Sequence, residues 1–433
     1  MQMRFDLSDS RWRYSFLLLI VLAAAGLSYP SVRIWMAAQC EQSDDPAKWL
    51  AAAHLEPGNA QYWGRLGLYY QWNLENRNLP DAIHYLQRAT EINPRSAPLW
   101  MDIAALYEAQ GDPAATKQAY EMGRRDFPVS PEVAWNYGSF LLRQRNFPSA
   151  FAVLRYALMN DSSLEASALS ECWHVDPDVA AITDNLLPRQ GPYYVRAIRY
   201  FLSQHQTDAA LFTWTRFLTL SQPVSMLDAI DLINNLMNEN RVNDAQQVWN
   251  QALQRSAWPR DANENHSLVF NAGFEHYFLN GGFDWRELPI SGASYNFDNS
   301  VVHSGHRSLR VAFDGSANLN FQHLYQYVPF VSHQRYRFRA YLCTEEITTD
   351  SGIRFEIFDP RHQNEVDVST PDILGTNKWT PVQIDFESGS ATHLLEILLR
   401  RKPNVGFDNK LRGIVWVDDV SLVPIADATK NSP

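Results

Sequence analysis

The chain has 433 residues, of which 45% are hydrophobic and 20% are charged, and its formal net charge is -11. This length suits two or three domains, and the composition is that of a folded protein, which excludes long disordered regions. An acidic chain without a run of Lys or Arg lacks the basic face that phosphate contacts need, so nucleic-acid binding is also excluded. Three widely spaced Cys predict neither a disulfide framework nor a zinc site.

An uncharged apolar run, FLLLIVLAAAGL at residues 16–27, follows three arginines near the N-terminus. Extended to residues 14–32, it predicts one transmembrane helix that acts as a signal anchor. The arginines before it place residues 1–13 in the cytoplasm. We therefore expect a single-pass protein of the inner (cytoplasmic) membrane whose C-terminal bulk is periplasmic or extracellular. A cleaved signal peptide is the alternative, and both alternatives export the chain beyond about residue 40.

Residues 45–260 are rich in Ala, Leu, Gln and Arg, with apolar residues at helical spacing. Large and small residues recur at a fixed period, since Trp100 and Ala134 are 34 residues apart, as are Tyr120 and Leu154. This pattern resembles the tetratricopeptide repeat (TPR) family, which implies an α-helical solenoid whose concave surface binds partner proteins. The alternative is that the repeats only space or present the C-terminal domain.

After about residue 260 the pattern changes to short strands of alternating polarity, separated by turns that contain Gly, Asn and Ser. Such strands predict an all-β jelly-roll sandwich over residues 267–425, so the whole chain is expected to be multidomain. The predicted strands are 308–313, 319–330, 336–343, 353–358, 382–386, 394–399 and 414–422.

Five motifs of this region follow one another in a recognisable order. They are residues 271–275 (NAGFE), 305–311 (GHRSLRV), 336–341 (YRFRAY), 378–380 (KWT) and 417–422 (VDDVSL). This order resembles carbohydrate-binding modules of the family 4, 9 and 22 type, in the galactose-binding-like group, and implies a polysaccharide or oligosaccharide as ligand. It also implies a structural calcium held by Glu275 and Asp418, with Asp419 as an alternative to Asp418. A hydrogen-bonded pair of acids without a metal is equally compatible with these residues.

Alternation along the strand 319–328 places Phe321, His323, Tyr325 and Tyr327 on one face. Rings on an open face can stack on the C–H groups of sugars while polar neighbours bind the hydroxyls. The alternative is that these rings fill the sandwich core and that the intervening Gln side chains face water. Arginines add paired donors for hydroxyls or a uronate. The other candidates for glycan binding are Trp285, Arg339, Arg354 and Glu356.

The sequence contains no GxSxG, HExxH or Walker motif. Its adjacent acids, such as Glu345 and Glu346, do not form the facing pair that a glycosidase needs. We therefore expect no enzymatic activity and no cofactor other than the calcium. The predicted role is binding of a glycan by the sandwich and of proteins by the repeats, in cell-envelope or exopolysaccharide assembly. A protein-interaction adaptor without glycan binding, or a glycan-active enzyme with an unrecognised site, are the alternatives.

Overall fold

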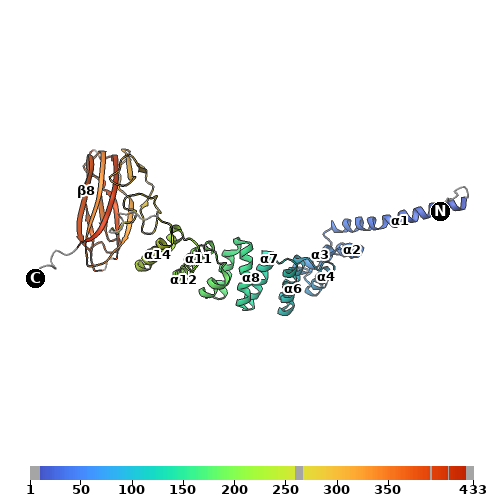
Figure 1. Cartoon of the computed structure of the whole chain (residues 1–433). Helices are drawn as coiled ribbons and strands as arrows, with labels where there is room; N and C mark the ends of the chain where they lie inside the picture. The colour runs from blue at the N-terminus through green and yellow to red at the C-terminus, as the bar shows by residue number, and fades with distance from the viewer. Residues whose placement is uncertain (1–9, 259–266, 391–392, 408, 426–433) are drawn as a thin grey trace, which may run out of the picture. The chain divides into compact units, whose positions relative to one another are not determined.

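The computed structural model describes residues 10–258, 267–390, 393–407 and 409–425 (Figure 1). The chain divides into two compact units, residues 1–188 and 189–433. The predicted helical region 45–260 is divided between these units, because its last helices belong with the strands. Residues 1–9 of the predicted cytoplasmic segment, and residues 259–260, lie outside the described residues.

The N-terminal helix α1 (Ser10–Glu41) runs through Pro30 without interruption. The apolar side chains of its first half are exposed, which is typical of a helix that is apolar on all sides. The portion Arg13–Glu41 is long and apolar enough to cross a membrane. The last turns of α1 are covered by protein, since Ala37 is buried in one cluster with Trp49 of the next helix.

The rest of the first unit consists mainly of helices that pack in successive pairs, α3 with α4, α5 with α6 and α7 with α8. A glycine allows the close approach in each pair: a Cβ on Gly67 would lie 2.6 Å from Leu86 Cγ, one on Gly138 would lie 2.6 Å from Leu154 Cγ, and one on Gly123 would lie 3.2 Å from Trp100 Cβ. The helices are α2 (Pro46–Leu55), α3 (Ala60–Trp72), α4 (Leu79–Ile92), α5 (Ala97–Gln110), α6 (Pro113–Asp126), α7 (Pro131–Arg143) and α8 (Phe147–Asn160).

Shorter elements follow these pairs: η1 (Ser162–Leu164), α9 (Glu165–Val175), α10 (Val179–Ala181) and the π-helix η2 (Ile182–Leu186). The second unit begins with two further pairs, α11 (Gly191–Ser203) with α12 (Thr207–Phe217), and α13 (Met226–Asn238) with α14 (Val242–Arg255). Helix α13 starts with a capping box. The Ser225 side chain accepts a backbone N–H of the first helical turn, and the Asp228 side chain accepts the backbone N–H of Ser225.

The strands of the second unit form two five-stranded antiparallel sheets. The first sheet has the order β1-β4-β9-β6-β7 and the second has the order β2-β3-β10-β5-β8. The predicted layout of an apolar helix, a helical solenoid and an all-β sandwich is therefore confirmed. The strands are β1 (Arg286–Glu287), β2 (Ala293–Asp298), β3 (Ser308–Asp314), β4 (Phe321–Pro329), β5 (Arg335–Ile347), β6 (Arg354–Phe358), β7 (Asp367–Ser369), β8 (Gly375–Glu387), β9 (Leu394–Arg401) and β10 (Arg412–Ile425).

The core of the sandwich lies between the two sheets. Phe338 of the second sheet and Phe355 of the first meet there, with ring centroids 5.0 Å apart. Alternate residues of β4 and β9 point inward, and the buried amide of Gln326 is satisfied because it both accepts from and donates to the backbone of Phe270. The opposite side chains of each strand are left on the outer faces of the sheets.

Helices α13 and α14 contact the sandwich directly within the second unit. Asn234 Oδ1 accepts hydrogen bonds from the amide of Gly282 (3.0 Å) and from Nη2 of Arg286 (2.7 Å). The Trp249 indole meets the Phe283 ring edge to face at 5.7 Å. The last helical pair therefore holds the segment that leads into β1.

Candidate functional site

Strand β4 carries the predicted aromatic residues but does not keep them all on one face. Its pairing with β9 shifts register between Phe321 and Leu324, and Phe321 turns into the core, where it is fully buried. Trp285 is also fully buried, with its ring 5.2 Å from that of Phe274 and its N–H donating to the carbonyl of Asn271. The predictions that Phe321 and Trp285 contact a glycan are wrong, because neither ring reaches solvent.

The other three predicted residues of β4 lie on the outer face of the first sheet. His323, Tyr325 and Tyr327 are half-buried, and the two tyrosine rings meet edge to face with centroids 5.5 Å apart. Gln326 between them is buried, which is the opposite of the alternative in which the rings fill the core. We call this surface the tyrosine face, and it comprises Arg286, His323, Tyr325, Tyr327, Glu356, Glu396, Leu398, Arg400 and Lys402.

An open groove of about 450 Å³ runs over the tyrosine face. Two cross-strand rows build its floor, because residues that pair across β4, β9 and β6 share a face. One row is Tyr325, Leu398 and Glu356, and the next is Tyr327, Glu396 and Phe358. Each row therefore places a tyrosine ring at one side of the groove and reaches β6 at the other.

Arg286 lies beside the tyrosines on β1, where it pairs with Tyr325. Its guanidinium carbon is 4.8 Å from the centroid of the Tyr327 ring and 5.9 Å from that of Tyr325. Burial lowers the pKa of Arg286, and its Nη1 has no hydrogen-bond partner among the described residues. A cation that contacts two ring faces helps to fix the orientation of both rings.

Glu356 on β6 is surrounded by cations. Its carboxylate lies 2.7 Å from Lys402 Nζ, 3.3 Å from Arg400 Nε and 3.5 Å from Arg354 Nε. Arg354 also contacts Asp372 at 2.5 Å. Glu356 lines the groove, where charges of both signs are interspersed, and Arg354 lies next to it without lining the groove.

The polar groups next to the rings have pKa values that differ from their usual ones. Burial raises the pKa of Glu396, while a hydrogen bond from Tyr327 and the charge of Arg286 oppose that rise. Burial and the neighbouring Glu396 raise the pKa of Tyr327 to about 12, so its hydroxyl is protonated at neutral pH. Burial and Arg400 lower the pKa of His323, and its Nδ1 accepts from the amide of Gln322 at 3.2 Å, which leaves Nε2–H of the neutral imidazole as a donor.

Arg339 does not join the tyrosine face. It lies exposed on β5 of the second sheet, with its guanidinium carbon 4.8 Å from the Tyr341 ring centroid. It lines another hollow, of about 590 Å³, together with His303, Glu275 and Asp419. Arg339 lies apart from Tyr325 and Tyr327 because β5 follows β4 in sequence but belongs to the other sheet, and its contact with a glycan stays a prediction.

The two predicted calcium ligands organise the loop between β2 and β3. Asp418 Oδ2 accepts from the amides of His303 (2.9 Å) and Ser304 (3.1 Å), and its Oδ1 accepts from the amide of Asp419. Glu275 Oε1 accepts from the amide of His306 at 2.8 Å. Both carboxylates therefore already have backbone partners.

Calcium needs about six to eight oxygen ligands. Within the described part of the chain, no group of three or more acidic, His or Cys side chains is placed to hold a metal ion. Burial raises the pKa of Asp418 to about 6, with the charge of Asp419 adding to the rise. Calcium binding by Glu275 and Asp418 stays a prediction to be tested, and so does the alternative without a metal.

Several residues of the tyrosine face were not predicted. Glu396 and Arg400 lie four residues apart on β9, so both project outward, and Lys402 follows that strand. The single charged residue within the otherwise apolar run 394–399 was a usable signal for Glu396. Arg286 had none, because its strand is two residues long.

The tyrosine face can bind a ligand that combines apolar ring faces with many hydroxyl groups. The rings of Tyr325 and Tyr327 offer stacking surfaces, and His323 offers a neutral donor. Glu356, Lys402 and the neighbouring charges supply charge-assisted hydrogen bonds of both kinds.

No protein-family model matches the chain, and no curated protein matches it. The solved structures that are similar to it include carbohydrate-binding modules. One of these is a family 4 module, at 13% identity over 36% of this chain and 99% of its own length, with a TM-score of 0.28. Another is TmCBM61 in complex with β-1,4-galactotriose, at 17% identity over 37% of this chain and 100% of its own, with a TM-score of 0.27.

TPR-like helical proteins form a second group of similar structures. PilF of Pseudomonas aeruginosa is 20% identical over 46% of this chain and 78% of its own length, with a TM-score of 0.24. Both resemblances expected from the sequence, to TPR proteins and to carbohydrate-binding modules, are thus present among the solved structures.

Proposed function

We propose that this chain is a membrane-anchored, exported scaffold that binds a glycan on the tyrosine face and partner proteins on its helical repeats. It acts without catalysis, in cell-envelope or exopolysaccharide assembly. The observation that carries the proposal is the placement of Tyr325 and Tyr327, half-exposed and side by side, over a groove rimmed by charged and polar groups.

The charges of the groove favour a polysaccharide or oligosaccharide over a small apolar ligand. Glu356 and Glu396 accept from hydroxyls, while Arg400 and Lys402 donate to hydroxyls or to the carboxylate of an acidic sugar. Cations and carboxylates alternate, so both neutral and acidic glycans suit the surface.

The anchor is helix α1, whose portion Arg13–Glu41 is long and apolar enough to span a bilayer. Arginines before the apolar run favour an N-terminus in the cytoplasm, which exports the repeats and the sandwich. The intact mass of the membrane-extracted chain distinguishes a retained anchor from a cleaved signal peptide.

The experiment that tests glycan binding is affinity electrophoresis of the full chain through gels that contain single neutral or acidic polysaccharides. At least one polysaccharide is expected to retard the natural chain. The double variant Tyr325→Ala/Tyr327→Ala is expected to lose about 2 kcal/mol of binding free energy, roughly thirtyfold in affinity, because it removes both stacking rings.

Tyr277→Ala is the matched control, since Tyr277 is an exposed tyrosine of the sandwich outside the groove. Thermal unfolding of each variant checks that the sandwich is intact. Full retardation of a folded double variant would contradict the tyrosine face as the site. A natural chain that no polysaccharide retards would favour the adaptor without glycan binding.

A further inference from the structure

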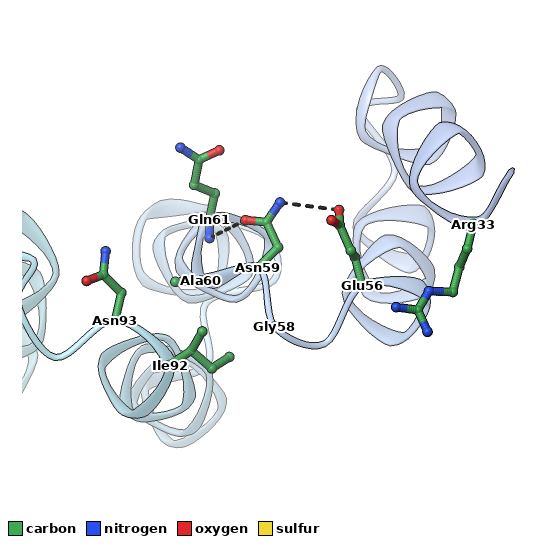
Figure 2. Close-up of a pocket in the computed structure, with 8 residues that line it drawn as sticks. All are labelled: Arg33, Glu56, Gly58, Asn59, Ala60, Gln61, Ile92 and Asn93. Atoms are coloured by element: carbon green, nitrogen blue, oxygen red, sulfur yellow. Dashed lines mark hydrogen bonds between the residues drawn. The ribbon is translucent and has the colours of Figure 1, made fainter. Parts of the chain in front are cut away.

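A polar hollow of about 700 Å³ lies in the first unit, beside the end of the apolar part of α1 (Figure 2). Its walls come from α1, from the turn between α2 and α3, and from the end of α4. The lining residues are Arg33, Glu56, Gly58, Asn59, Ala60, Gln61, Ile92 and Asn93.

The position of this hollow along α1 places it at the level of phospholipid headgroups. The predicted span 14–32 is about 29 Å long at the rise of an α-helix, which matches the hydrocarbon thickness of a bilayer. Arg33 is the next residue. Ile34, Trp35 and Met36 are exposed although apolar, and Trp is enriched at membrane interfaces. The bilayer surface therefore reaches this part of α1, and the hollow opens where headgroups lie.

Two opposite charges face the hollow without neutralising each other. Figure 2 shows the side chain of Arg33 extending from α1 toward the turn that carries Glu56. Nε of Arg33 is buried and has no hydrogen-bond partner among the described residues, and neither side chain belongs to an ion pair there. The hydrogen-bond partners of Glu56 are the amide of Asn59, at 3.4 Å, and the hydroxyl of Tyr62.

We propose that this hollow binds the headgroup of a phospholipid that carries both a phosphate and a primary ammonium, as phosphatidylethanolamine does. The phosphate contacts Arg33, whose planar guanidinium matches phosphate oxygens with two parallel N–H donors. The ammonium donates to Glu56 and to the amide oxygen of Asn93, which is exposed at the rim. The inference rests on the membrane anchoring proposed above and is independent of glycan binding.

The charges of the hollow predict how tightly different phospholipid headgroups bind relative to one another. A choline group keeps the positive charge but has no N–H to donate, and a glycerol group has hydroxyls but no positive charge. Ethanolamine offers both the charge and three N–H donors to Glu56 and its neighbours. We therefore expect phosphatidylethanolamine to bind more tightly than phosphatidylcholine or phosphatidylglycerol.

The test uses the full chain in nanodiscs made from equal parts of phosphatidylethanolamine, phosphatidylcholine and phosphatidylglycerol. Native mass spectrometry of the released protein counts the retained lipids. We expect retention of phosphatidylethanolamine over the other two by roughly tenfold, since one hydrogen bond to a charged group has about that effect. Arg33→Gln is expected to lower retention of all three lipids. Glu56→Gln is expected to remove only the preference for ethanolamine.

Arg88→Gln and Glu91→Gln are matched controls, because these residues form an exposed ion pair on α4 outside the hollow. The helical signal in far-UV circular dichroism confirms that each variant is folded. Equal retention of the three lipids by an inserted natural chain contradicts the headgroup site alone, as does a preference that survives both hollow variants. A preference for phosphatidylglycerol contradicts the role of Glu56. A chain that stays out of the nanodiscs contradicts the anchor and with it the headgroup site.

Discussion

The outer faces of the two sheets of the sandwich carry similar residues but pack their tyrosine rings differently. On the first sheet, Tyr325 and Tyr327 touch each other edge to face and border an open groove. On the second sheet, the Tyr341 ring is stacked on His303 with centroids 3.7 Å apart, and Arg339 lies over the same ring. The imidazole therefore occupies a face of the Tyr341 ring, whereas the described residues place no ring stacked in parallel on Tyr325 or Tyr327.

The partners of the acids differ between the two faces in the same way. Glu356 on the first sheet contacts side-chain cations, which can exchange partners with a ligand. Asp418 on the second sheet accepts backbone amides of the loop 303–306 and holds that loop in place. The comparison favours the first sheet for the proposed ligand binding, while Asp418 on the second sheet holds a loop, and the following variants test this difference.

The largest expected effect concerns Asp418. Burial raises its pKa from 3.8 to about 6, so between these pH values the folded chain holds a proton that the unfolded chain has released. This proton stabilises the folded chain fully at pH values below the pKa of Asp418 in the unfolded chain. As the pH rises through about 6, the free energy of unfolding falls by about 3 kcal/mol because this stabilisation is lost. Urea unfolding of the natural chain and of Asp418→Asn at a series of pH values measures the difference.

The free energy of unfolding of Asp418→Asn relative to the natural chain is expected to rise as the pH increases from about 4 to about 7. Glu346→Gln, an exposed acid on β5, is the control and should leave the profile unchanged. If the free energies of unfolding of the natural chain and of Asp418→Asn change in parallel with pH, then Asp418 is not a buried acid of shifted pKa. Added calcium that abolishes the slope of the natural chain would instead support the ion predicted at Glu275 and Asp418.

An intermediate effect is expected from Asn234→Ala, which removes the acceptor of the Arg286 guanidinium. A buried cation left without this partner costs about 2 kcal/mol of stability. Because Arg286 contacts both tyrosine rings, glycan retention should weaken as well. Urea unfolding and affinity electrophoresis measure the two changes.

Asn238→Ala is the control for this variant, because Asn238 is an exposed residue at the end of the same helix. If Asn234→Ala lowers stability but leaves retention intact, then the last helical pair supports the sandwich without positioning the tyrosine face.

The smallest expected effect comes from Glu356→Gln. This change removes the carboxylate that Arg354, Arg400 and Lys402 share, and it leaves these cations available to an acidic glycan. Retention in gels of acidic polysaccharide should increase a few-fold, by less than about 1 kcal/mol, because partly exposed ion pairs are weak. Retention by neutral polysaccharide should change little.

Measuring that increase at low and at high salt checks its electrostatic origin, since salt screens exposed charges. Glu345→Gln, an exposed acid on the second sheet, is the matched control. No change with any acidic polysaccharide would place the bound glycan away from β6.

Residue alternation predicted the part of the site that lies along one strand. It placed His323, Tyr325 and Tyr327 together, because a regular strand alternates strictly between its faces. It failed for Phe321, where the register shift moves one residue to the other face. Such an irregularity depends on the partner strand and has no signature in the sequence of β4 alone.

The parts of the site that depend on the order of strands in the sheets could not be predicted from the sequence. Arg339 has the exposed parity that alternation predicts, yet it lies on the other sheet, since β5 pairs with β8 and β10 rather than with β4. Arg400 and Lys402 reach the tyrosines because β9, about seventy residues later in the chain, pairs with β4. Strand pairing over such distances is decided by the packing of the whole sandwich.

The ring contacts of Trp249 limit how this sandwich can be exchanged between proteins. Its indole meets Phe270 at 5.0 Å and Phe283 at 5.7 Å, and both phenylalanines belong to the β-rich segment. A recombination event that joins the chain at residue 267 to a foreign neighbour would leave these rings without their cover. A join placed before Ser225 keeps α13 and α14 with the strands. The sandwich and its last helical pair therefore pack as one structural unit.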